Sequence, residues 1–186
     1  MRPVRMLGVG LMLAASAGWA GTGDVISAVW KEQHLSLLYM GRTSRYTCDG
    51  LRDKVRAMLI DLGARRDLEI TALGCEGPAA QVRLASPGPS LNIVVSTPAL
   101  PASKPRPQRA ADSRLVAARF EPFTITSNAF RNMGIADCEL VEEFTHQILP
   151  KLVTRGLTQD ITCVPFQESG GRYLVRGEVL RALPPR

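Results

Sequence analysis

Four cysteines constrain the fold of this 186-residue chain more than any other feature. Cys48 and Cys138 each stand at the start of a helical pattern, whereas Cys75 and Cys163 each stand at the end of a strand pattern. The offset between equivalent cysteines is nearly constant, at 90 residues for the first pair and 88 for the second. The same local arrangement therefore occurs twice, which predicts an internal duplication.

The first helical pattern lies in RYTCDGLRDKVRAMLIDLG, residues 45–63, and ends at Gly63, a typical C-terminal stop. Its apolar residues recur at helical spacing and share one face: Leu51, Val55, Met58, Leu59 and Leu62. Strands are predicted at His34–Met40, in DLEITALGC, and as two short strands around a turn at Ser86–Ser90.

The second segment repeats this plan. The stretches RFEPFTITS, TQDITCVPF and GGRYLVRGEVL predict strands, and DCELVEEFTHQILPKLVTRG predicts a helix with Val141, Phe144, Ile148 and Leu152 on one face. We expect Asp137 to cap this helix and Pro150 to bend or end its last turn. Acidic residues near its start, where negative charge is favourable, are Glu139, Glu142 and Glu143.

These patterns predict an α+β fold of two β-α-β-β units, residues 21–98 and 119–186, with two helices on one face of a largely antiparallel sheet. A proline-rich basic linker, residues 99–118, joins them. Two separate small domains are the alternative architecture.

Helix and strand lengths favour one disulfide pairing of the three that four cysteines allow. A helix of about 15 residues spans about 22 Å, and the following strand returns over about 26 Å. The strand therefore ends beside the start of the helix, which predicts the disulfides Cys48–Cys75 and Cys138–Cys163. Each would stabilise the fold by about 3 kcal/mol.

Redox catalysis is the alternative use of these cysteines, because a helix N-terminus lowers a thiol pKa. The sequence has no C-x-x-C turn, however, and the wide separation of the cysteines disfavours a zinc site. We therefore expect structural disulfides and neither a metal nor a cofactor.

The N-terminus has the pattern of a secretory signal peptide. Arg2 and Arg5 precede an uncharged apolar run, and Gly18 and Ala20 suit cleavage after Ala20. The apolar run is shorter than the roughly 20 residues of a spanning helix, although an N-terminal anchor is the alternative. We expect a periplasmic or secreted bacterial protein without a transmembrane segment in its mature form.

Positive charge is concentrated in the linker. The chain carries a formal net charge of +6. The segment 99–119 contains several basic residues and a single acidic one, Asp112. A solvated linker explains this pattern, and a contact to an anionic envelope component through Lys104, Arg106 and Arg109 is the alternative. No basic stripe with stacking aromatics is visible, so we expect no nucleic-acid partner.

No catalytic motif identifies an enzyme. His34 begins a predicted strand, and His146 lies four residues after Glu142, the spacing of a surface ion pair. The sequence therefore predicts a non-enzymatic binding or structural module, acting on an unknown protein or envelope component through a sheet edge or the linker. A periplasmic hydrolase with a site assembled from distant residues is one alternative, and a thiol oxidoreductase is another.

Overall fold

The computed structural model describes residues 24–74, 89–101, 115–127, 133–167 and 171–184. Over these ranges the chain forms one antiparallel sheet of six strands with two α-helices, which confirms the predicted α+β class. The strands are β1 (Ile26–Leu38), β2 (Glu69–Leu73), β3 (Ser90–Ala99), β4 (Leu115–Thr126), β5 (Thr154–Thr162) and β6 (Arg172–Ala182). The helices are α1 (Cys48–Asp61) and α2 (Cys138–Gln147), with 3₁₀ turns at Ile135–Asp137 and Leu149–Lys151.

The predicted signal peptide, residues 1–20, lies outside the described residues. Among the helices that are described, none is both long enough and apolar enough to cross a membrane.

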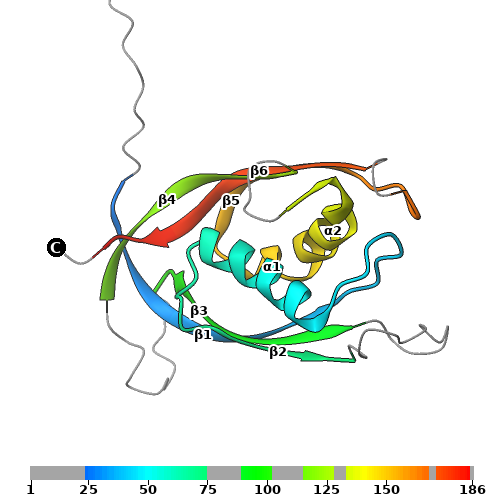
Figure 1. Cartoon of the computed structure of the whole chain (residues 1–186). Coiled ribbons are helices and arrows are strands. Elements are labelled where there is room, and N and C mark those ends of the chain that lie inside the picture. The colour runs from blue at the N-terminus through cyan, green and yellow to red at the C-terminus, as the bar shows by residue number, and fades with distance from the viewer. Residues whose placement is uncertain (1–23, 75–88, 102–114, 128–132, 168–170, 185–186) are drawn as a thin grey trace, which may run out of the picture.

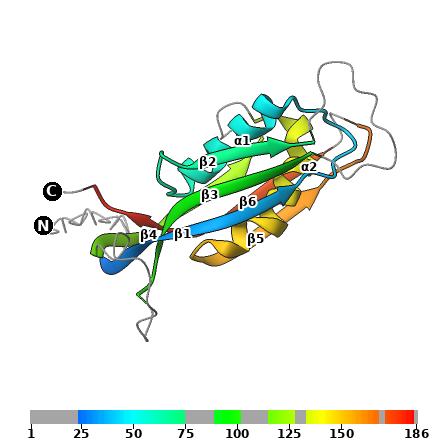
Figure 2. The ribbon, with the colours of Figure 1, turned by 90° about the horizontal axis from the view of Figure 1, so that it is seen from below.

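The sheet consists of two three-stranded arms, ordered β2-β3-β1 and β4-β6-β5. Each arm follows the same chain order of strand, helix, strand and strand, with its third strand in the middle. Within the described residues, the strand pairing that joins the arms is that of Ile26–Val29 of β1 with Leu115–Ala118 of β4. From this junction the arms diverge, and both helices lie between them (Figure 1). Figure 2 shows the outer surface of the first arm, with β1, β3 and β2 side by side.

The segment predicted as a linker is partly strand. β3 continues to Ala99, and residues 115–118 already belong to β4 because they pair with β1. The basic side chains proposed as contacts, Lys104, Arg106 and Arg109, lie outside the described residues.

Helix α1 forms and ends as its sequence predicts. Thr47 caps its start by accepting a hydrogen bond from the Gly50 N–H at 3.1 Å. At the other end Gly63, with φ of 89°, allows the paired bonds of a Schellman motif, from Gly63 N–H to Ile60 and from Ala64 N–H to Leu59. Its buried face consists of Leu51, Val55, Met58 and Leu59, each contributing roughly 1.5–3 kcal/mol of burial free energy.

Helix α2 ends early at its proline, as predicted, and well before the end of its helical pattern. The helical pattern extended to Gly156, but α2 ends at Gln147, and Pro150 lies in the 3₁₀ turn that follows. A proline ring clashes with the helix and removes a donor, so the chain leaves the helix and begins β5 at Thr154. The four apolar residues predicted for one face are nevertheless all buried.

Strand β1 is longer than predicted, because it begins at Ile26 rather than near His34. The stretch Lys31–His34 is polar and lacks the alternating apolar pattern of a strand. Every residue from Val29 to Leu38 nevertheless lies opposite a partner in β3. Pairing of the backbone with a neighbouring strand therefore extends β1 through residues with no apolar signal.

The larger of two apolar clusters among the described residues joins both helices to the facing sides of both arms, and a small one, Ala28, Ala118 and Leu180, lies at the β1–β4 junction. The larger cluster contains fully buried side chains from α1, α2 and four of the strands, so neither arm has a separate core. Beside it, β5 contains a bulge at Gly156 and Leu157, opposite Gly177 of β6. A Cβ at Gly177 would lie 3.2 Å from the Arg155 carbonyl oxygen, which explains why glycine occupies this position.

Candidate functional site

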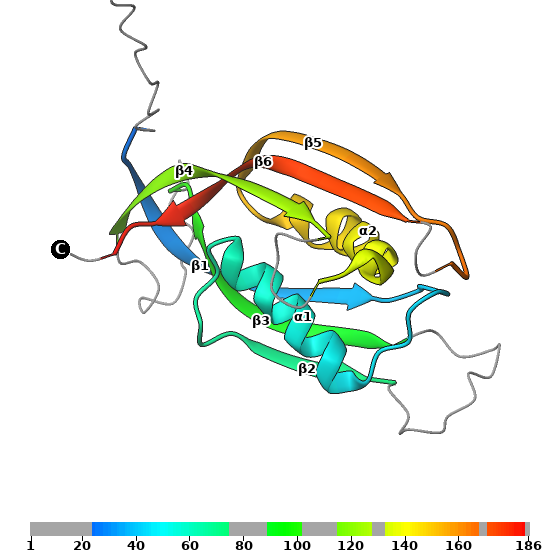
Figure 3. The same cartoon turned by 45° about the horizontal axis from the view of Figure 1, so that its top comes forward.

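The end of the molecule away from the β1–β4 junction contains a cluster of hydrogen-bonded polar groups around two buried carboxylates, which we call the polar junction: Tyr46, Lys54, Gly134, Asp137 and Glu139. The loop between β1 and α1 meets the start of α2 here, so the cluster connects the two halves of the chain (Figures 1 and 3). Asp137 and Glu139 are among the few buried charged residues of the described chain, at 4% and 9% exposure.

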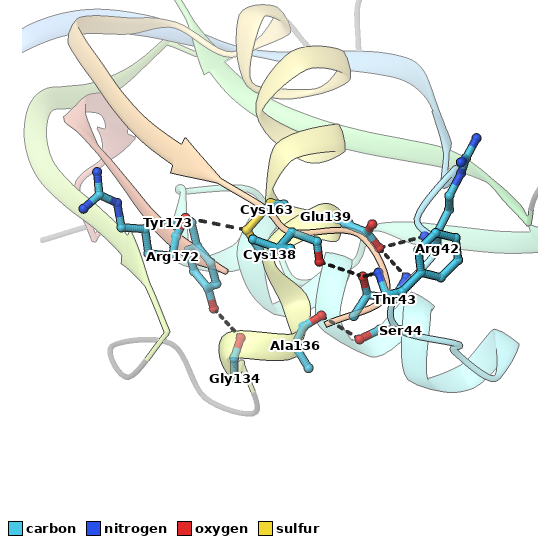
Figure 4. The surroundings of a disulfide bond; sticks show 12 residues. Arg42, Thr43, Ser44, Gly134, Ala136, Cys138, Glu139, Cys163, Arg172 and Tyr173 are labelled. Carbon is cyan, nitrogen blue, oxygen red and sulfur yellow. Dashed lines mark hydrogen bonds between the residues drawn. A yellow bond between two sulfur atoms is a disulfide. The ribbon is translucent and has the colours of Figure 1, made fainter. Parts of the chain in front are cut away.

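Glu139 holds the loop between β1 and α1. Its Oε2 accepts hydrogen bonds from the backbone N–H groups of Arg42 and Thr43, both at 2.7 Å (Figure 4). Next to it, Ser44 Oγ donates to the Ala136 carbonyl at 2.6 Å. A carboxylate that accepts two backbone N–H groups satisfies donors that would otherwise be buried without partners.

Asp137 binds donors from three segments. Its Oδ1 accepts from the Tyr46 hydroxyl at 2.5 Å, and its Oδ2 accepts from Lys54 Nζ at 2.8 Å and from the Gly134 N–H at 2.7 Å. Asp137 occupies the N-cap position of α2, but its side chain makes no capping bond to the helix, so the predicted capping role is wrong. The tertiary donors occupy the carboxylate instead.

The tyrosines around this carboxylate are strongly shifted toward their neutral forms. Burial, followed by the hydrogen bond to Asp137, raises the pKa of Tyr46 far above its ordinary value. Burial raises the pKa of Tyr39 and Tyr173 as well, with the charge of Glu139 adding to the effect at Tyr39 and that of Asp137 at Tyr173. These hydroxyls therefore act as hydrogen-bond donors, and Tyr173 donates to the Gly134 carbonyl at 2.9 Å.

The disulfide Cys138–Cys163 connects the start of α2 to the end of β5, which confirms this predicted pairing. The two Cα atoms lie 5.6 Å apart. Gly171 packs tightly on the bond, since a Cβ there would come within 2.9 Å of the Cys138 Cβ. The other predicted pairing involves Cys75, which lies outside the described residues, so Cys48–Cys75 stays a prediction.

The two histidines do not approach the buried carboxylates. The side chain of His34 is 77% exposed in the middle of β1, where its Nε2 lies 3.5 Å from Glu32. His146 is exposed on α2, and the ion pairs found among the described residues do not include the predicted pair with Glu142. Neither histidine is therefore placed for proton transfer with Asp137 or Glu139.

Two shallow surface hollows lie on the first arm. One is lined by β2 and β3 together with Glu32, Arg65 and Asp67, and the other includes His34 and Asn92. Arg65 already pairs with Asp67 at 2.5 Å. The described ranges bring no three His, Cys, Asp or Glu side chains together in a geometry suited to a metal ion.

The polar junction was not predicted from the sequence. Tyr46 and Lys54 lie 91 and 83 residues from Asp137, and no local spacing relates them. In comparisons with protein-family models, curated proteins and solved structures, the chain matches none. The interpretation of function therefore rests on the residues and geometry described above.

Proposed function

We propose that the protein is an exported, non-enzymatic binding module of the bacterial envelope, and that it holds an extended segment of a partner protein along the free edge of β5. The observation that carries this proposal is the exposure of β5, of whose nine residues seven are exposed. β5 is the outermost strand of its arm, as Figure 3 shows.

An edge strand presents unpaired backbone N–H and C=O groups, to which an added strand can hydrogen-bond. In β5 the bulge at Gly156 and Leu157 interrupts the edge, whereas Thr158–Thr162 pairs regularly with β6. The regular stretch is therefore the docking segment. Its exposed Thr, Gln and Asp side chains favour a polar partner strand, because they offer hydrogen bonds and little apolar surface.

The roles of the polar groups support a binding function over catalysis. The buried carboxylates Asp137 and Glu139 accept hydrogen bonds from the protein itself, and both histidines lie on exposed surfaces. These groups serve the fold, so the hydrolase alternative has no assembled acid–base pair among them.

Export is supported by the signal-peptide pattern and by the disulfide Cys138–Cys163, because stable disulfides persist in oxidising compartments. We also propose a second disulfide, Cys48–Cys75. We further propose that the two arms arose by internal duplication, because both have the same strand order. A mass-spectrometric disulfide map of the exported protein tests the pairing, and a Cys48–Cys138 bond would contradict it.

The edge proposal is tested with a random 12-residue peptide library displayed on phage and selected on the exported protein. Hydrogen exchange of the protein with a selected peptide should show new protection at alternate amides of Thr158–Thr162, because only alternate residues face the open edge. Leu174–Arg176 of β6, which pairs with β4 on one side and β5 on the other, is the internal control and should not change. A library that yields no binder, or protection away from β5, would refute the proposal.

A further inference from the structure

A turn at the same end as the polar junction presents an exposed aromatic ring. The Gln167 N–H donates to the Val164 carbonyl at 3.2 Å, Pro165 takes the second position of the turn, and Phe166 takes the third with φ of 66°. That position belongs to glycine or asparagine in turns of this kind, because other side chains clash with the left-handed backbone. Phe166 is also 73% exposed, so its ring gains little by packing within the protein.

Hydrogen bonds hold this strained turn in place. The Phe166 N–H donates to Thr43 Oγ1 at 2.9 Å, and the Thr43 N–H in turn donates to Glu139 at 2.7 Å. Figure 4 shows the bonds from Glu139 to the β1–α1 loop, and Thr43 of that loop in turn binds the backbone of the turn. The backbone that carries the ring is therefore fixed before any partner binds.

Two more apolar side chains are exposed on segments joined to this turn. Met40 is 57% exposed in the loop between β1 and α1, and Ile135 is 45% exposed beside Ala136, whose carbonyl binds Ser44. In Figures 1 and 3 the β1–α1 loop and the chain after β5 lie together at one end of the molecule. We call this set the tip surface: Met40, Arg42, Arg45, Ile135 and Phe166.

The exposed charge of the tip surface is positive. The segments 39–47, 133–139 and 163–167 contain two arginines, Arg42 and Arg45, and two acids, Asp137 and Glu139. Both acids are buried and hydrogen-bonded within the protein, whereas both arginines are exposed. The occupant of this surface should therefore combine negative charge with an apolar layer.

We propose that the tip surface docks on an anionic phospholipid bilayer. The ring of Phe166, with Met40 and Ile135, enters the boundary between headgroups and acyl chains, while the guanidinium groups of Arg42 and Arg45 bind lipid phosphates. A bilayer surface meets both requirements at once, and a protruding tip can reach it without a matching pocket. This proposal does not depend on peptide binding at β5.

The test is co-sedimentation of the exported protein, purified with its natural N-terminus, with vesicles of phosphatidylglycerol and phosphatidylethanolamine. We expect partitioning that weakens at high salt and is much weaker on phosphatidylcholine vesicles. Phe166→Ala should lower the partition coefficient about tenfold, because part of the ring's burial is lost. Arg42→Gln and Arg45→Gln should each lower it about fivefold.

The matched control is Leu115→Ala, which removes a similarly exposed apolar side chain, 65% exposed, at the β1–β4 junction. It should leave partitioning unchanged. The proposal is overturned if Leu115→Ala and Phe166→Ala lower partitioning equally, if both vesicle types bind equally, or if neither binds. A protein crosslinked to position 166 in cells, without vesicle binding, would assign the surface to a protein partner and also overturn it.

Discussion

The hydrogen bonds to Asp137 lead to a quantitative prediction about how the two halves are held together. Asp137→Ala removes the acceptor of the Tyr46 hydroxyl, of the Gly134 N–H and of Lys54 Nζ. The side chains of the ion pair are only 20% exposed at Lys54 and 6% at Asp137, so solvent replaces the lost partner poorly. Breaking a buried pair in this way costs about 3–5 kcal/mol of unfolding free energy.

A double-mutant cycle separates one bond from the rest of the cluster. Tyr46→Phe should cost about 1.5–3 kcal/mol, the range for a hydrogen bond to a charged acceptor. Combined with Asp137→Ala, it should add much less than its separate cost, giving a coupling energy of about 1.5–2 kcal/mol. Urea unfolding followed by circular dichroism measures each free energy, provided that the slope of the transition stays constant.

Asp53→Asn on α1 is the matched control, because its partner Arg52 lies 3.6 Å away and the Asp53 side chain is 68% exposed. It should change stability by less than about 0.5 kcal/mol. The reasoning is refuted if Asp137→Ala costs less than about 1 kcal/mol, or if the coupling with Tyr46 is near zero.

Three further predictions follow from single features. Replacing Cys138 and Cys163 together by serine should lower the unfolding free energy by about 3 kcal/mol in urea, and an unchanged free energy would show that the bond does not constrain the unfolded chain. The buried tyrosines hold their protons to higher pH when folded than their unfolded pKa of about 10, so this stability is present below pH 10 and declines above it. Above pH 10, the unfolding free energy should fall more steeply with pH in the wild type than in Tyr46→Phe, by up to about 1.4 kcal/mol per pH unit. Equal slopes in the two proteins would argue against a raised Tyr46 pKa. Phe166→Asn should be about 1 kcal/mol more stable than Phe166→Ala, because asparagine tolerates the left-handed backbone, and equal melting temperatures would show that the turn is unstrained.

Local patterns were sufficient for α1 and for one disulfide. The apolar spacing of α1 and its stop at Gly63 depend on residues within one or two turns. The Cys138–Cys163 pairing joins the start of a helix to the end of the strand that follows it in the sequence. These features are encoded within about 25 residues, a range over which chain geometry alone is restrictive.

Strand boundaries depended on partners that local patterns do not reveal. The polar stretch Lys31–His34 has no buried-face signal, and β3 nevertheless pairs with all of it. Thr154–Gly156 carried a helical pattern, and the sheet incorporates Thr154 and Arg155 by pairing them with β6. Backbone hydrogen bonds to a neighbouring strand form whatever the side chains are. They therefore override weak local preferences for another conformation.

The sequence by itself determined the positions of two amphipathic helices, the end of α1 at Gly63 and the Cys138–Cys163 pairing. Only the tertiary structure decided how the arms share one core, that Asp137 binds Tyr46 and Lys54 instead of capping its own helix, and that Phe166 is displayed beside Thr43. The physical reason is the distance along the sequence over which each kind of interaction acts. Helix periodicity and turn chemistry act between near neighbours, whereas a buried carboxylate binds whichever donors the folded chain brings within 3 Å, here from residues more than 80 positions away.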